Sequence, residues 1–295
     1  MARRTASHRN SPRRTRRNAS LKAATAKKSR RRRLPKLWPA AGTRRKWARS
    51  FRRLPFGAQF VVGFIVLAAA GLLLNGLYQV IRKPSELFFP VSGTLYKTPT
   101  ETWDSYSTIF ERHSTSLITP AFLAALAQIE GSGNSIVRTY WRFSLSSRPF
   151  EIYRPASSAV GMYQITDGTF DEARRYCIHD HAVVEDGPWT DVHSCWFNGL
   201  YVRTVPSHAV ELTSAYLHRK VTEALASRGA RRVSQIQAQD LAALIHLCGA
   251  GAGRRYVARG LRLLPGQRCG DHEVARYVAK MRATRAIFER LEQQG

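Results

Sequence analysis

Glu130 is the carboxylate of this chain whose surroundings best suit acid–base chemistry. It follows Ala-Gln-Ile and precedes Gly-Ser-Gly, which places it at the end of a predicted apolar helix. Apolar neighbours and the negative end of a helix dipole both favour the neutral carboxyl. A carboxyl that keeps its proton near neutral pH can serve as a general acid, for example toward a glycosidic oxygen. On local sequence alone, a solvent-facing Glu at a helix end is the commoner arrangement.

The helix that positions Glu130 has clear boundaries in the sequence. Thr119-Pro120 supplies a capping hydroxyl followed by proline at the first helical position, and Gly131 ends the apolar run. Because long β-type alternation is missing, we expect the C-terminal part of the chain to be mainly α. Further helices are predicted over residues 165–178 (begun near Thr166 or Asp167), 207–226, 241–247 and 271–293, with a loop or small hairpin over 135–158. The glycines at 249–253 predict a flexible loop.

An apolar segment precedes this helical domain. Residues 54–81 carry no charged side chain, and a membrane-spanning helix needs about 20 such residues. A cleaved signal peptide is the alternative, but the apolar run continues beyond its small residues. We therefore predict a transmembrane anchor over 54–81, a linker over 82–100 and a catalytic domain over 101–295.

The N-terminal residues 1–53 form a strongly basic tail. They hold 21 of the 47 basic residues and no acidic one, which leaves an ordinary 26 basic against 20 acidic residues for the remainder. We expect the tail to be disordered, to stay in the cytoplasm by the positive-inside rule and to bind anionic membrane lipids. Because aromatic side chains are not interleaved with its charges, we do not expect nucleic-acid binding.

The four cysteines lie beyond the apolar segment, as expected of disulfides in an exported domain. They allow three pairings, among which local closure favours Cys177–Cys195 with Cys248–Cys269. A metal site is the alternative around the first pair, but its spacing matches no common zinc pattern. That cluster comprises Cys177, His179, Asp180, His181, His193 and Cys195.

Four segments in order resemble the soluble lytic transglycosylases of the lysozyme-like superfamily. TPAFLAALAQIEGSGN is similar to the family's catalytic Glu segment, and SSAVGMYQITDGTF to its Gly-Leu-Met-Gln-type segment. AALIHLCGAGAGRR resembles the Ala-Tyr-Asn-Ala-Gly segment, and HEVARYVAKM the late segment with a Tyr-Val pair. The similarity covers about residues 119–281 and implies a mainly α, lysozyme-like domain.

The resemblance implies a reaction and a set of residues. Glu130 would be general acid and then general base in cleaving peptidoglycan glycan strands, leaving 1,6-anhydromuramoyl ends. Gln164 would line the substrate cleft beside Glu130, Met162 and Tyr163 would shape its floor, and Tyr277 would hold Glu130 by a hydrogen bond; these four would be the substrate-binding residues. No cofactor or metal is implied. The domain would face the periplasm from a bacterial inner membrane. Envelope or secretion machinery is a further candidate partner.

This sequence also departs from the family pattern. Gly131 stands where Ser is usual, and Cys248-Gly249 where Tyr-Asn is usual. Ordinary glycosidases place a second carboxylate about 5–9.5 Å from the acid. Of the candidates, we expect Asp167 to cap a helix and Glu151 to be an exposed loop charge, which favours the intramolecular reaction. A muramidase of the same fold and an inactive glycan-binding scaffold remain the alternatives.

An aromatic cluster lies between Glu130 and Gln164. We expect most of its members to pack the loop and one or two to face the cleft. The cluster comprises Tyr140, Trp141, Phe143, Phe150 and Tyr153.

Overall fold

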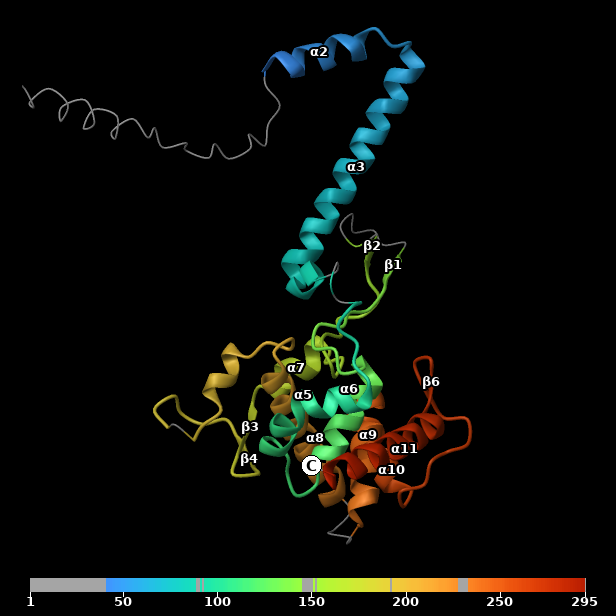
Figure 1. Ribbon diagram of the computed structural model, residues 1–295. Coiled ribbons are helices and arrows are strands. Elements are labelled where there is room, and N and C mark those ends of the chain that lie inside the picture. The colour runs from blue at the N-terminus through green and yellow to red at the C-terminus, as the bar shows by residue number, and fades with distance from the viewer. Residues whose placement is uncertain are drawn as a thin grey trace, which may run out of the picture. The chain divides into compact units, whose positions relative to one another are not determined.

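The computed structural model describes residues 41–88, 91, 93–144, 151, 153–191, 193–227 and 233–294 (Figure 1). The chain divides into two units, Met1–Leu67 and Ala68–Gly295. Most of the predicted disordered tail, residues 1–40, lies outside the described residues.

The described part of the tail is helical, which corrects the prediction of disorder for it. Helix α2 covers Ala41–Arg52. Arginine, lysine and alanine are good helix formers, so a sequence too polar to build a core can still form an isolated helix here. The exposed Trp47 adds an apolar side chain to an otherwise basic surface.

Helix α3, Phe56–Arg82, contains the predicted anchor. Its stretch Phe56–Ile81 is long and apolar enough to cross a membrane, and little of it is buried within the protein. The prediction of one membrane-length helix is therefore confirmed in length and composition.

The predicted linker is partly structured. The 3-10 helix η1, Pro84–Phe88, follows α3 directly, and Lys83 and Glu86 are both buried. Helix α5, Pro99–Arg112, then begins with a capping box in which the Thr98 side chain accepts from the Glu101 backbone and the Glu101 carboxylate accepts from the Thr98 backbone.

The remaining part of the chain is mainly helical, with three small antiparallel hairpins. The further helices are α6 Pro120–Gly131, α7 Asp167–Ala173, the 3-10 helix η3 Trp196–Leu200, α8 Pro206–Ala226, α9 Gln235–Cys248, α10 Ala250–Ala258 and α11 Val274–Glu292. The hairpins pair β1 Trp141–Phe143 with β2 Tyr153–Pro155, β3 Tyr176–His179 with β4 Ala182–Glu185, and β5 Arg268–Cys269 with β6 His272–Glu273.

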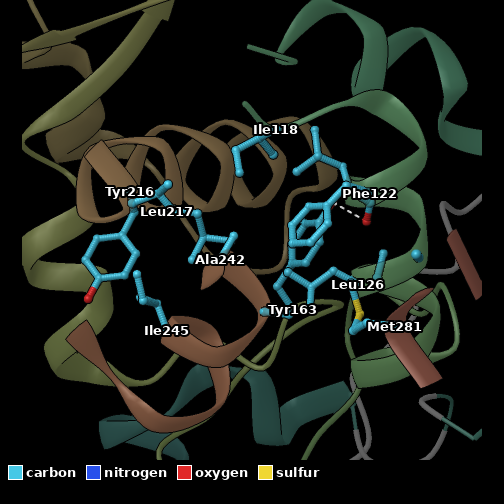
Figure 2. Close-up of a cluster of buried hydrophobic side chains, with 14 of the residues drawn as sticks. Ile118, Phe122, Leu126, Tyr163, Tyr216, Leu217, Ala242, Ile245 and Met281 are labelled. Atoms are coloured by element: carbon cyan, nitrogen blue, oxygen red, sulfur yellow. Dashed lines mark hydrogen bonds between the residues drawn. The ribbon is translucent and has the colours of Figure 1, made fainter. Parts of the chain in front are cut away.

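Helix α6 lies in the middle of the core. It packs against α5 and α11, and the side chains of Phe122 and Leu126 are fully buried among residues of these and other helices (Figure 2). Burying one such side chain contributes roughly 1.5–3 kcal/mol. This packing fixes α6, and with it the residue at its C-terminal end, against the rest of the domain.

Two predicted helices are shorter than expected because hairpins occupy their ends. The helix predicted over 165–178 stops at Ala173, and the chain turns back through Asp180 and His181, both with positive φ. The helix predicted over 271–293 starts only at Val274, after the hairpin that turns at Gly270.

Burial also affects the histidines. In four of them the loss of hydration is the first cause of a lowered pKa, so the folded protein favours their neutral form. These are His113, His208, His218 and His246.

Candidate functional site

Glu130 lies in the last turn of α6, where this buried helix approaches the surface. The helix begins as predicted, with the Thr119 hydroxyl accepting from the Phe122 backbone N–H at 3.2 Å. Residues 121–127 are buried, whereas the Glu130 side chain keeps 19% of its surface exposed. The carboxylate therefore lies between core and solvent.

Tyr277 of α11 holds this carboxylate. Its hydroxyl donates to Glu130 Oε1 at 2.5 Å, which is the contact that the family resemblance implies. Burial raises the pKa of Tyr277 well above its usual range, and the charge of Glu130 and the hydrogen bond act in the same direction. The phenol therefore stays protonated and remains a donor to Glu130.

His246 of α9 is a second neighbour that the sequence analysis did not single out. Its Nε2 lies 3.8 Å from the same Oε1, and its side chain is only 13% exposed. Burial lowers the pKa of His246, while Glu130 and a hydrogen bond to the Tyr163 backbone oppose that shift. In sequence, a histidine inside an apolar helical run resembles a core residue; its position two residues before Cys248 in the third family-like segment was the available signal.

A cavity of about 500 Å³ opens beside Glu130. Its wall carries charges of both signs, and Arg276 lies 3.5 Å from Glu273. The lining residues are Ile129, Glu130, Gln164, Asp271, His272, Glu273, Arg276, Tyr277 and Lys280. The arrangement can bind a polar substrate and present it to a carboxyl that is oriented by a neutral donor.

Gly131 permits the close contact between the two segments of the site. A β-carbon at this position would lie 2.8 Å from both the Cα and the carbonyl oxygen of Met162, closer than real β-carbons approach backbone atoms. The family's usual Ser would therefore not fit here without a backbone shift. The departure at Gly131 brings the Glu130 segment directly against the Met162 segment.

Met162 and Tyr163 do not lie where a substrate-binding role requires. Both side chains are fully buried, and the Tyr163 hydroxyl donates to the Leu123 carbonyl at 3.2 Å within the core (Figure 2). The predicted substrate-binding role is therefore wrong for these two side chains. They support the cavity from behind.

Gln164 does line the cavity, as expected. It has a left-handed backbone with φ of 47°, and its Nε2 donates to the Gly161 carbonyl at 2.9 Å. The side-chain amide thus stabilises its own turn beside Glu130, and the residue presents the remainder of its surface to the cavity.

The two predicted candidates for a second carboxylate lie elsewhere. Glu151 is buried and 3.2 Å from Arg154, so its expected exposure is wrong. Asp167 is the first residue of α7 rather than its cap, which is Thr166, and it pairs with Arg203 at 2.8 Å. Neither lines the cavity, whereas Asp271 and Glu273 do.

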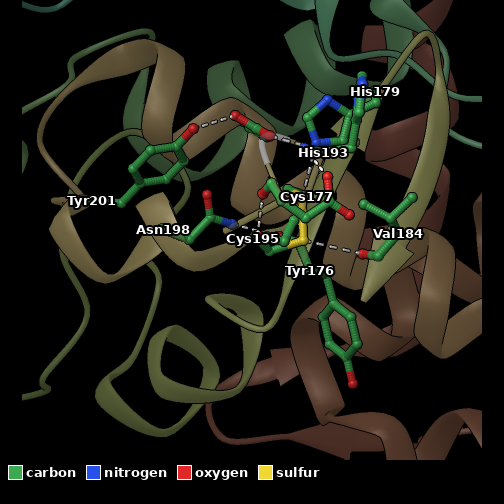
Figure 3. The surroundings of a disulfide bond; sticks show 12 residues. Tyr176, Cys177, His179, Val184, His193, Cys195, Asn198 and Tyr201 are labelled. Atoms are coloured by element: carbon green, nitrogen blue, oxygen red, sulfur yellow. Dashed lines mark hydrogen bonds between the residues drawn. A yellow bond between two sulfur atoms is a disulfide. The ribbon is translucent and has the colours of Figure 1, made fainter. Parts of the chain in front are cut away.

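Both favoured disulfides are present. Cys177–Cys195 ties β3 to the start of η3, near Asn198, whose side chain donates to the Tyr176 carbonyl (Figure 3). Cys248–Cys269 ties the end of α9 to the β5–β6 hairpin, which brings part of the cavity wall to the helix of His246. Among the described residues, no group of His, Cys, Asp and Glu side chains could hold a metal ion.

The glycine-rich segment after α9 is not the flexible loop that was predicted. Gly249 joins two helices with φ of 80°, and α10 begins at the next residue. Gly253 lies within α10, where a β-carbon would be 2.4 Å from the Ile245 side chain. These glycines serve a tight helix junction and close helix packing.

The aromatic residues of the 140–153 region do not line the Glu130 cavity. Tyr140 and Phe143 are exposed, and Trp141 and Tyr153 line a separate pocket beside α3, while Phe150 lies outside the described residues. The expectation that one or two face the cleft is not met by the four that are described.

Comparison with protein-family models, with curated proteins and with solved structures finds no match to this chain.

Proposed function

We propose that this chain is a peptidoglycan lytic transglycosylase with a lysozyme-like catalytic domain, anchored in a membrane by α3. The observation that carries the proposal is the pairing of Glu130 with Tyr277 at 2.5 Å inside a solvent-open cavity. The four family-like segments support it, because the structure brings residues from each of them around that carboxylate.

In the proposed reaction, Glu130 donates its proton to the oxygen that links N-acetylmuramic acid to N-acetylglucosamine, and the muramoyl C1–O bond breaks. The Glu130 carboxylate then accepts the proton of the muramoyl C6 hydroxyl as that oxygen bonds to C1. The product is a 1,6-anhydro end, and Glu130 regains its proton. Tyr277, as a neutral donor, would stabilise the carboxylate between these two steps.

Hydrolysis by a muramidase is the second candidate, and one observation favours it. Asp271 and Glu273 line the same cavity as Glu130, so either carboxylate could orient an attacking water. This route would leave reducing muramic ends rather than anhydro ends.

The proposed location is the periplasmic side of a bacterial inner membrane. The basic residues before α3 favour a cytoplasmic N-terminus by the positive-inside rule. Two disulfides in the domain after α3 support an oxidising compartment for that domain. The basic residues before α3 would contact anionic lipids.

The test is product analysis with the full-length chain in detergent micelles. The full chain is needed because Asn75 and Lys83 of the α3 end both hydrogen-bond to the domain. Intact sacculi would be incubated with wild type, Glu130→Gln and the control Glu292→Gln, an exposed position at the end of α11 that does not line the cavity, and soluble products identified by mass spectrometry.

Anhydromuramoyl products from wild type and Glu292→Gln, with none from Glu130→Gln, would support the proposal. Reducing ends that disappear in Glu273→Gln or Asp271→Asn would establish the hydrolase instead. Glycan binding without products from wild type would refute both and favour a scaffold.

A further inference from the structure

A stripe of polar residues runs along one face of the C-terminal part of α3 and into η1. Asn75, Gln79, Lys83 and Glu86 follow one another at intervals of four, four and three residues, and each is buried, at 5–8% exposure. Asn75 and Gln79 belong to the apolar stretch Phe56–Ile81. Buried amides at that depth need a partner from the protein, because hydrocarbon supplies none.

The β1–β2 hairpin and the segment after it supply these partners. Asn75 Nδ2 donates to the Tyr153 carbonyl at 2.7 Å. Lys83 Nζ donates to the Ala159 carbonyl at 2.9 Å, and Glu86 accepts from the indole N–H of Trp141 at 2.8 Å. Asn75 of α3 and Glu86 of η1 therefore hold the hairpin, and Lys83 holds the segment that follows it.

The hairpin contacts reach a level of α3 that lies inside the apolar stretch. Asn75 precedes Ile81 by six residues, which is about 9 Å at 1.5 Å per residue. An apolar pocket of about 450 Å³ extends still further, to Leu72. It is lined by Leu72, Asn75, Gly76, Val80, Glu86, Arg138, Trp141 and Tyr153.

The two faces of the hairpin differ in chemistry. On one face, the Tyr153 ring lies 5.0 Å from the ring of Trp141 and 4.6 Å from that of Phe143, and Phe143 is 74% exposed. On the other face, Arg142 lies directly opposite Arg154 in the strand register. Aromatic and basic side chains together are typical of protein surfaces at the boundary between hydrocarbon and lipid headgroups.

We propose that the β1–β2 hairpin inserts into the membrane leaflet next to the C-terminal end of α3. Its aromatic face contacts acyl chains, which also fill the pocket that extends to Leu72, and Arg142 contacts lipid phosphates. Asn75 holds the hairpin at this depth. The inference rests on α3 spanning a membrane, as proposed above, but not on the enzymatic reaction. It would keep the catalytic domain at the membrane surface.

Photolabelling from the lipid phase tests this inference. The full-length chain would be reconstituted in vesicles of phosphatidylcholine and phosphatidylglycerol that contain a phospholipid with a photoactivatable acyl chain, and labelled peptides mapped by mass spectrometry. We expect label on α3 and on β1–β2. Label on α3 without label on the hairpin would overturn the inference alone, whereas absence of label from α3 would overturn the anchor as well.

Two variants with a matched control sharpen the test. Asn75→Leu removes the donor to Tyr153 and should lower hairpin labelling several-fold while α3 labelling stays unchanged. Gln59→Leu makes the same kind of change in the first turn of α3, where the amide contacts Leu54, and should alter neither. Hairpin labelling that is unchanged in Asn75→Leu would overturn the role of Asn75.

Phe143→Glu addresses the aromatic face separately, because a side chain that is 74% exposed can be replaced without disturbing the core. A carboxylate there should lower hairpin labelling several-fold, since a charge resists transfer into hydrocarbon. Labelling equal to that of wild type would overturn the assignment of this face to acyl chains.

Discussion

Replacing Gly131 by Ala should destabilise the domain although alanine is the better helix former. The new β-carbon would lie 2.8 Å from the Cα and the carbonyl oxygen of Met162, and ordinary contacts of this kind begin near 3.4 Å. Backbone atoms on both sides must therefore separate by about 0.6 Å. Because α6 is fixed by core packing, the strain cannot be relieved by rotating a side chain.

The magnitude follows from two opposing effects. Overpacking a well-packed site costs about 1–3 kcal/mol, and exchanging glycine for alanine in a helix contributes up to about 1 kcal/mol in the other direction. We expect a net loss of about 1–2 kcal/mol, or a fall of about 2–8 °C in the unfolding midpoint for a domain of this size. Moving Glu130 relative to Gln164 should also lower kcat/KM at least tenfold.

Gly251→Ala is the matched control. It too lies in a helix, but the nearest atom to its new β-carbon is Arg255 Nη1 at 3.7 Å. This variant should gain about 0.5–1 kcal/mol and keep full activity. Thermal unfolding of the full chain in detergent, followed by tryptophan fluorescence, would compare the two. Equal midpoints for both alanine variants would refute the argument from close contact.

Three further predictions concern Tyr277, the disulfide Cys248–Cys269 and the four histidines with lowered pKa values. Tyr277→Phe should lower kcat/KM about 10- to 100-fold with little change in the unfolding midpoint, because a hydrogen bond to a charged group contributes about 1.5–3 kcal/mol; a loss below threefold would contradict this. Replacing Cys248 and Cys269 together by Ser should lower the free energy of unfolding by about 3 kcal/mol. Because the β5–β6 hairpin lines the cavity, this change should lower activity more than removal of the disulfide Cys177–Cys195 does, and equal activity losses would contradict the reasoning. The unfolding midpoint should fall as pH drops below about 6.5, because four buried or partly buried histidines have lowered pKa values when folded and bind protons on unfolding. The contribution of these histidines to the free energy of unfolding is complete above their pKa in the unfolded chain and is lost as the pH falls. An unfolding midpoint that stays constant between pH 7 and 5.5 would contradict this account.

The parts of the fold that the sequence predicted correctly are those with a local signal, such as a helix cap or a long uncharged run. Thr119-Pro120 and Gly131 mark both ends of α6, and the uncharged run marks α3. The hairpins after α7 and before α11 were missed because strands of two to four residues show too little alternation to be recognised. Helix α5 was not predicted although Thr98 and Glu101 form its capping box, because Pro99 is as compatible with a linker as with the first position of a helix.

The residues of the candidate site were predictable only where they belong to a segment that resembles a family motif. Glu130 and Tyr277 come from distant helices, and the family-like segments brought them together before any geometry was known. The approach of His246 to Glu130 was not predictable, because it depends on the tertiary positions of two helices that are distant in the sequence. Met162 and Tyr163 also belong to such a segment, but their side chains point into the core. The turn at Gly161 sets this direction, and the pattern of residue types in the sequence does not show it.

Each departure from the pattern of the resembled family has a local physical reason in the structure. Gly131 is required by the approach of Met162, and Gly249 has a positive φ that an asparagine side chain would make less favourable. Cys248, which stands where the resembled family usually has a tyrosine, ties the charged β5–β6 hairpin to α9. Charged side chains from this hairpin and from α11 line the cavity beside Glu130. Under the proposed function, this charged wall beside the pair of Glu130 and Tyr277 predicts altered substrate contacts rather than loss of catalysis.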